Sequence, residues 1–274
     1  MKLQNNRLQE IKVLIVGGCF PVQDNINEED LYHQIMRKKI MDQYGIHLSI
    51  DVLRYENIKT CTELIERKAA LRKPDLLLFH MRVEPVLPKV RLYNAYTSRK
   101  GIIKRSIRIF SKIIFRTSEV NSNSGSNSSK KSTRKFHSLM RELNYLSGIL
   151  AFNSVTLKKE CLQLFGELSE YCRSMNIELI ITGPVSRPRS YYENMISEQI
   201  DEFARGQIRG VNEQYISFLG LENEQKEFLF CEDLIKVNEA GHKRISELIL
   251  EQMIQNRLFR NNYFKRTNFF ESLN

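Results

Sequence analysis

The feature that most constrains the fold is a run of four apolar residues, Val13 to Val16, that leads into two glycines and a cysteine. An apolar run without polar alternation is typical of a strand buried on both faces, as in a parallel sheet. Gly17 and Gly18 allow a tight turn and a close backbone approach to a ligand. Ligands bind at the carboxyl ends of strands in open α/β sheets, so Cys19 is expected at the mouth of such a crevice. The alternative is a small buried hydrophobe beside a structural turn.

Later segments continue as alternating strands and helices. Strands are predicted near 12–16, 47–54, 75–80, 177–182 and 227–231. Helices are predicted over 28–44, 62–71, most of 190–219, and 239–254, with one or two more over 136–176. The first has Asn27 as N-cap and Gly45 as its stop. The β-α-β order predicts helical crossovers and one parallel sheet. The expected fold class is a three-layer α/β/α sandwich with a central parallel sheet.

The pattern breaks in the middle of the chain and at its end. We expect a single α/β domain over 1–256, interrupted by a basic, partly disordered insertion at 91–136 and followed by a basic and aromatic tail at 257–274. Residues 102–116 are predicted to form a helix that presents Lys104, Arg108, Lys112 and Arg116 together. Such a face suits an anionic membrane surface, or it is simply a solvated face. Residues 119–135 have the composition of a flexible linker.

Composition limits the partners and the compartment. The chain has 42 Lys and Arg against 32 Asp and Glu, a net charge of +10, which favours acidic partners. Nucleic-acid binding has only this charge in its favour and is not the preferred interpretation. No run approaches the ~18 apolar residues that span a bilayer. Five cysteines without CxxC spacing indicate neither a disulfide framework nor a zinc site, so a cytoplasmic location is expected, with contact at the membrane periphery as an option.

The closing motif is the most informative stretch. Asp233 is followed by Lys236, Asn238 and then the pair Gly241-His242 inside a predicted helix. This order resembles the last block of the SGNH (GDSL-type) hydrolase superfamily, with Lys236 at the place of the catalytic histidine. We interpret His242 as a helix residue packed under the loop.

Earlier blocks of the family are matched mainly by position. Gly17, Gly18 and Cys19 stand where the family has Gly-Asp-Ser, so that Cys19 replaces the nucleophilic serine. Thr60 or Cys61 stands where the family's oxyanion glycine is expected, and Arg82 takes the place of the block-three asparagine. The resemblance runs from residue 11 to about 254, apart from the insertion.

The resemblance implies an esterase or acyltransferase, with an acylated carbohydrate as substrate and no metal or cofactor. Cys19 would be the nucleophile, because a thiol beside a cation needs less help from a base than a hydroxyl does. Lys236, paired with Asp233, would hold the thiolate, while Gly18, Arg82, Thr60 and Asn238 would stabilise an oxyanion or bind substrate. The alternative is an inactive descendant that binds a glycan or a lipid-linked intermediate. The oligomeric state is left open.

Overall fold

The computed structural model describes residues 9–18, 21–23, 26–56, 58–83, 155–188, 191–208, 213–219, 229–231 and 236–255. Its strands are β1 (Gln9–Gly17), β2 (Ile46–Arg54), β3 (Leu76–His80), β4 (Glu178–Thr182) and β5 (Glu213–Ile216). Its α-helices are α1 (Tyr32–Tyr44), α2 (Cys61–Arg72), α6 (Val155–Ser174), α7 (Tyr191–Gln207) and α8 (Glu239–Gln255). Short 3-10 turns lie at Glu28–Asp30 and Ile58–Thr60.

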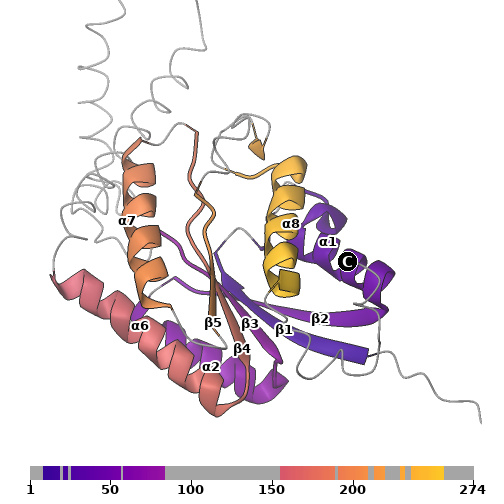
Figure 1. Ribbon diagram of the computed structural model, residues 1–274, viewed down its shortest axis with the longest axis horizontal. Helices are drawn as coiled ribbons and strands as arrows, with labels where there is room; N and C mark the ends of the chain where they lie inside the picture. The colour runs from indigo at the N-terminus through magenta and orange to yellow at the C-terminus, as the bar shows by residue number, and fades with distance from the viewer. Residues whose placement is uncertain are drawn as a thin grey trace, which may run out of the picture.

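The five strands form one sheet in the order β2-β1-β3-β4-β5, and every pairing between them is parallel. Helices α1 and α8 cover one face, and α2, α6 and α7 cover the other (Figure 1). The predicted three-layer α/β/α fold is therefore confirmed. The carboxyl ends of all strands meet at one edge, where a site was expected.

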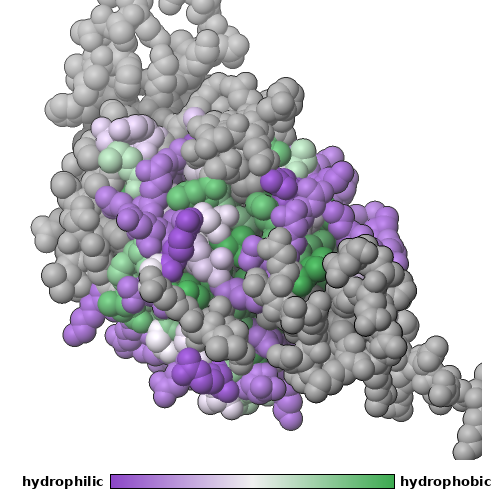
Figure 2. Space-filling model, viewed as in Figure 1, coloured by the Kyte–Doolittle hydropathy of each residue, from purple (hydrophilic) through white to green (hydrophobic). Residues whose placement is uncertain are grey.

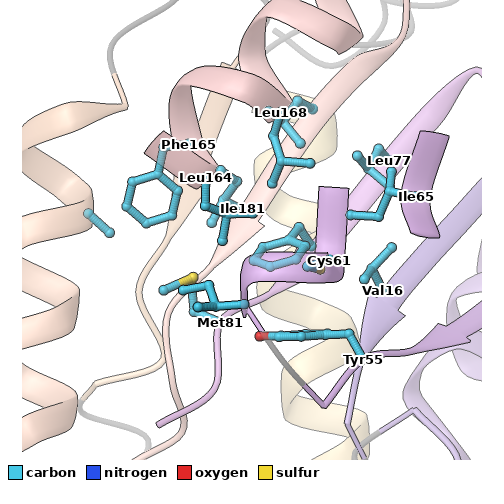
Figure 3. Packing of buried hydrophobic residues seen from close by; sticks show 14 of the residues in the cluster. Val16, Tyr55, Cys61, Ile65, Leu77, Met81, Leu164, Phe165, Leu168 and Ile181 are labelled. Carbon is cyan, nitrogen blue, oxygen red and sulfur yellow. The ribbon is translucent and has the colours of Figure 1, made fainter. Parts of the chain in front are cut away.

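The alternation of side chains along the strands explains the two layers. In β1, Ile11, Val13 and Ile15 belong to the core under α1 and α8. Leu14 and Val16 point the other way, into the core under α2, α6 and α7. Both sets are buried, which is why the run from Val13 to Val16 contains no polar residue, whereas Lys12 just before it is exposed. Figure 3 shows the second core, where side chains of α6 meet those of the sheet.

Figure 2 shows hydrophobic side chains at several places on the viewed face, among them the region between α7 and α8, with hydrophilic side chains next to them. None of the described helices is long and apolar enough to cross a membrane.

The fifth strand was predicted in the wrong place. β5 is Glu213–Ile216, within the stretch predicted to be helical, and α7 ends earlier, at Gln207. Of the segment predicted as a strand at 227–231, the structure describes 229–231, and within these residues Phe230 forms an isolated antiparallel bridge with Val237. Four residues are too few for the alternation to stand out from the helix before them. Tertiary packing selects the strand, because Ile216 and the following Phe218 fill the core under α8.

The first helix also differs from its prediction in detail. A 3-10 turn precedes α1, and Leu31 between them is extended, with ψ 137°. Asn27 makes no side-chain cap; its amide donates to the Asp30 carboxylate at 3.2 Å instead. Gly45 ends α1 as predicted, with φ 64° and its N–H donating to the Met41 carbonyl at 2.9 Å. Helices α2 and α8 lie at their predicted places, and α6 lies within the range predicted for one or two helices.

The insertion at 91–136 and the tail at 257–274 lie outside the described residues. So do the predicted basic helix at 102–116 and the linker at 119–135. Their structure, and contact with an anionic membrane surface, stay predictions.

Candidate functional site

A cavity of about 160 Å³ opens at the carboxyl edge of the sheet. Its walls come from the segments that follow β1, β3, β4 and β5 and from the segment before α8. The lining residues are Gly18, Gln23, His80, Met81, Arg82, Val83, Gly183, Pro184, Val185, Arg187, Glu193, Phe218, Lys236 and Val237. We call this cavity the carboxyl-edge pocket.

Three of the predicted site residues meet in this pocket. Gly18, Arg82 and Lys236 all line it, although they come from three distant parts of the sequence. Gln23 Nε2 donates to the carbonyl of Val237 at 2.6 Å, which ties the segment after β1 to the residue next to Lys236. Gly18 is the residue before Cys19, so this hydrogen bond helps to hold the two ends of the predicted motif together.

Two predicted residues, Cys19 and Asp233, lie outside the described residues. Their roles stay predictions, supported only by their neighbours along the chain.

Thr60 and Asn238 are placed elsewhere, and neither lines the pocket. Thr60 is exposed at the start of α2. Asn238 caps α8: its Oδ1 accepts from the N–H of Gly241 at 2.9 Å. Its Nδ2 donates to the Phe230 carbonyl at 3.1 Å, which joins the cap to the 229–237 bridge. Asn238 is thus committed to the local fold, and any effect on substrate would be indirect.

Arg82 and Gly18 fit together closely. The Arg82 Nη1 donates to the carbonyl of Tyr55 at 2.7 Å, and the guanidinium lies 5.7 Å from the centre of the Tyr55 ring. A Cβ on Gly18 would lie 2.3 Å from Arg82 Nε, so a larger residue at position 18 would require the Arg82 side chain to move. Gly18 and Arg82 are therefore fitted to each other.

A second arginine in the pocket was missed by the sequence analysis. Arg187, on the loop after β4, forms an ion pair with Glu193 of α7, whose side chain is 2% exposed. The backbone of Arg187 is held from both sides: its N–H donates to Asn194 Oδ1 at 2.7 Å, and its carbonyl accepts from Asn194 Nδ2 at 2.8 Å. The sequence signal that could have found Arg187 is the one that found Arg82: a basic residue follows a buried strand within a few positions.

A buried group of aromatic and imidazole side chains lies next to the pocket, at the end of β3. His80, at the end of β3, has Nε2 at 2.5 Å from the Tyr32 hydroxyl and Nδ1 at 2.7 Å from Thr182 Oγ1. The Tyr32 N–H donates to His242 Nδ1 at 3.3 Å, and the two rings are stacked. His33 meets the edge of the Tyr32 ring. We call Tyr32, His33, His80 and His242 the imidazole cluster.

Burial decides the charge of this cluster. Desolvation lowers the pKa of His80 to about 3 and that of His242 to about 4, and a charge on His33 would lower both further. Burial also lowers the pKa of His33 and raises that of Tyr32. The imidazoles are therefore neutral at neutral pH, each with one N–H donor and one acceptor. His242 is packed under the loop as its interpretation predicted, at 0% exposure.

Chemically, the described pocket offers cations rather than a general base. Among the described residues, no three His, Cys, Asp or Glu side chains are gathered as a metal ion would need. His80 reaches the pocket but is hydrogen-bonded at both ring nitrogens within the core. Arg82, Arg187 and Lys236 can donate hydrogen bonds to an oxyanion or hold an anionic group.

Neither a protein-family model nor a curated protein matches the chain at a significant level. Solved structures do. The chain is similar to the lipase Lip_vut3 from a goat rumen metagenome, with a TM-score of 0.56, 10% identity, and coverage of 90% of this chain and 99% of that one.

Two further solved structures are similar. One is the family 3 carbohydrate esterase of Clostridium thermocellum, with a TM-score of 0.51, 11% identity, and coverage of 90% and 96%. The other is a catalytic mutant of Axe2, an acetylxylan esterase from Geobacillus stearothermophilus, with a TM-score of 0.51, 9% identity, and coverage of 89% and 94%. At these identities the likeness concerns the fold, and it confirms the SGNH-hydrolase fold that the motif order predicted.

Proposed function

We propose that the protein is an SGNH-like esterase or acyltransferase that works in the carboxyl-edge pocket with Cys19 as nucleophile. The observation that carries the proposal is the convergence of Gly18, Arg82 and Lys236 on one cavity at the end of β1. The fold supports it, because the similar structures include a lipase and two carbohydrate-directed esterases. An acylated carbohydrate is the proposed substrate for the same reason.

The proposed step replaces the serine–histidine pair by a thiolate–ammonium pair. The Cys19 thiolate attacks the ester carbonyl carbon, and the new C–S bond forms as the carbonyl electrons move to oxygen. Arg82, held by Tyr55 beside Gly18, donates to that oxyanion together with backbone N–H groups of the turn. Collapse breaks the C–O bond, and the Lys236 ammonium gives a proton to the departing alcohol.

The resulting thioester is resolved by water or by an acceptor hydroxyl. Neutral Lys236 takes the proton of the attacking O–H, the C–S bond breaks, and the thiolate leaves. Asp233, three residues before Lys236, is proposed to orient the amine. The cycle returns every proton to its starting place, so no histidine is needed.

A second candidate is a protein that binds its ligand without turnover. The observation that favours it is the position of Arg82, whose guanidinium occupies the space directly over Gly18. A side chain lying there can block the approach of an ester to Cys19 as readily as it can bind an oxyanion. Binding of a glycan or a lipid-linked intermediate would then be the function.

Thiol reactivity and turnover separate the two candidates. Under the enzyme proposal, Cys19 reacts with iodoacetamide below pH about 7, well under the free-thiol pKa of about 8.5. Lys236→Ala should shift the pH profile of Cys19 alkylation upward by about one unit. Lys236 is exposed, and an exposed cation lowers the pKa of a neighbouring thiol less than a buried one does. Hydrolysis of 4-nitrophenyl acetate should disappear in Cys19→Ala.

The matched control is Cys231, which is partly exposed. Cys61 is a poor control, because it is buried in the core and its burial raises the pKa of its thiol to about 12. Each cysteine is followed by mass spectrometry after limited alkylation across pH. The nucleophile assignment fails if Cys19 labels no faster than Cys231, or if Lys236→Ala leaves the Cys19 profile where it was.

A further inference from the structure

The carboxyl-edge pocket has an unbalanced charge for a site that takes only a neutral ester. Its described lining contains three cationic side chains, Arg82, Arg187 and Lys236, and one carboxylate, Glu193. The proposed acyl chemistry uses Arg82 and Lys236. It gives no task to Arg187, which lies on the loop after β4.

Arg187 is nevertheless held in place more firmly than a solvated loop residue. Asn194 makes two hydrogen bonds to its backbone, and Glu193 pairs with its guanidinium. The Arg187 side chain is 17% exposed and that of Glu193 is 2% exposed, so the pair is largely desolvated. Desolvation offsets much of the attraction in such a pair, so stability alone is a weak reason to have one. A fixed guanidinium in a cavity wall is, however, what recognition of an oxyanion requires.

The rest of the pocket lining is largely apolar. The apolar lining residues are Met81, Val83, Pro184, Val185, Phe218 and Val237. The cavity has a volume of about 160 Å³ and is open to solvent, so it can take one part of a ligand while the remainder lies outside. The pocket therefore suits a short apolar chain with a charged end.

We infer that the substrate carries an oxyanion, a carboxylate or a phosphate, a few bonds from its ester, and that Arg187 binds this group. Glu193 and Asn194 are positioning residues that orient Arg187. The ester part of this inference rests on the proposed function, whereas binding of the anion does not require turnover. The substrate class is thus an anionic acyl or glycosyl ester rather than a neutral acetate.

Binding to the full chain is measured first, by titration calorimetry with glutarate, inorganic phosphate and the neutral diamide of glutaric acid. Glutarate or phosphate should bind, with the affinity falling as salt rises, and the diamide should bind at least tenfold more weakly. Tighter glutarate binding indicates a carboxylate on the acyl side, and tighter phosphate binding indicates a phosphorylated alcohol. Absence of binding by both anions, or equal binding of the diamide, overturns the inference.

Variants then test the residue. Arg187→Gln should weaken anion binding about tenfold or more, the effect of losing a charged hydrogen-bond donor. It also removes the guanidinium that pairs with the buried Glu193 carboxylate. The double variant Arg187→Gln, Glu193→Gln therefore replaces the pair with two neutral amides. The matched control is Arg67→Gln, which removes the same charge from an exposed position on α2. If the folded double variant binds the anion like the control, Arg187 is not the binding residue.

Turnover keeps this inference separate from the proposed function. The mono-4-nitrophenyl ester of glutaric acid and 4-nitrophenyl pentanoate have acyl chains of similar length, with and without the charge. A lower KM for the glutarate ester that the double variant abolishes supports the inference. Equal KM values overturn it while leaving the esterase proposal intact. Anion binding without any turnover supports the inference and rejects the esterase.

Discussion

The carboxyl-edge pocket and the imidazole cluster are neighbours at the end of β3, where they share His80, and they differ in almost every property. The pocket carries arginine, lysine and glutamate side chains around an open cavity. The cluster carries neutral rings packed at close range in the core under α1 and α8, with Tyr32 and His242 both at 0% exposure. His80 belongs to both, since it touches the cavity while its ring nitrogens bond to Tyr32 and Thr182.

The comparison shows that the histidines of this chain lie mostly in the buried cluster. The sequence has five, and three of them belong to the buried cluster. Their burial holds them neutral, so they serve the fold as polar core residues. Lys236 lines the pocket, and in the proposed mechanism its ammonium takes the place of a histidine. The proposed chemistry therefore depends on the Cys19 thiol and on the cations of the pocket.

The largest expected effect on stability comes from removing the Tyr32 side chain from the imidazole cluster. Tyr32→Ala removes a fully buried ring that contacts three imidazoles, and it should lower the free energy of unfolding by about 3–5 kcal/mol. Tyr32→Phe keeps the ring and removes only the hydroxyl bonded to His80, so it should cost about 1–3 kcal/mol. Urea unfolding measures both. Equal losses in the two variants would mean that the hydroxyl, and not the packing, holds the cluster.

The next effect is a pH dependence that belongs to the cluster and not to the pocket. The folded pKa of His80 is about 3 and that of His242 about 4, against 6.5 in the unfolded chain. Between these values the unfolded chain binds the protons, so stability is full above pH 6.5 and falls as the pH decreases. For each of these two histidines, the free energy of unfolding should fall by about 2 kcal/mol as the pH decreases from 7 to 5.

Unfolding curves at both pH values measure this loss. His242→Gln should remove about half of it. His47→Gln is the control, because His47 lies on β2 with its side chain 51% exposed and should leave the loss unchanged. A loss that is the same in the unaltered protein and in His242→Gln would place the titrating groups elsewhere.

Much of the fold could be predicted from the sequence because its signals are local. The apolar runs of β1 and β3 are buried on both faces, and the glycine after α1 adopts φ 64°. β5 was missed because its four residues carry too little pattern to compete with α7. What makes Glu213–Ile216 a strand is pairing with β4, which no local window contains.

Site residues could be predicted from the sequence only where the topology of the sheet determines their position. Gly18 and Arg82 follow buried strands, and parallel strands bring such residues to one edge. The contact between Arg187 and Glu193 could not be predicted, because it depends on the angle between a loop and α7, and the sequence does not specify that angle. Asn238 matched a family position, but its amide is used to cap α8. The imidazole cluster joins residues up to 210 positions apart, so no spacing could indicate it.

The smallest expected effect tests whether the pocket is as closely fitted as the core. A Cβ on Gly18 would lie 2.3 to 2.8 Å from three atoms of Arg82, so Gly18→Ala should cost about 1–2 kcal/mol by overpacking. Gly18 is not among the described residues with positive φ, so backbone strain adds nothing. In the Arg82→Ala background the added methyl meets no guanidinium, and the same substitution should cost less than about 0.5 kcal/mol. The difference is the coupling of a double-mutant cycle.

A second glycine provides the matched control. Gly166 lies in the middle of α6, with no atom within 4 Å of an added Cβ, so Gly166→Ala should stabilise the protein by about 0.5–1 kcal/mol. Opposite signs at the two glycines would show that contact with Arg82, and not glycine itself, sets the cost at Gly18. If Gly18→Ala is tolerated equally with and without Arg82, the arginine moves aside at little cost. Arg82 would then be a mobile side chain of the pocket and not a preorganised oxyanion donor.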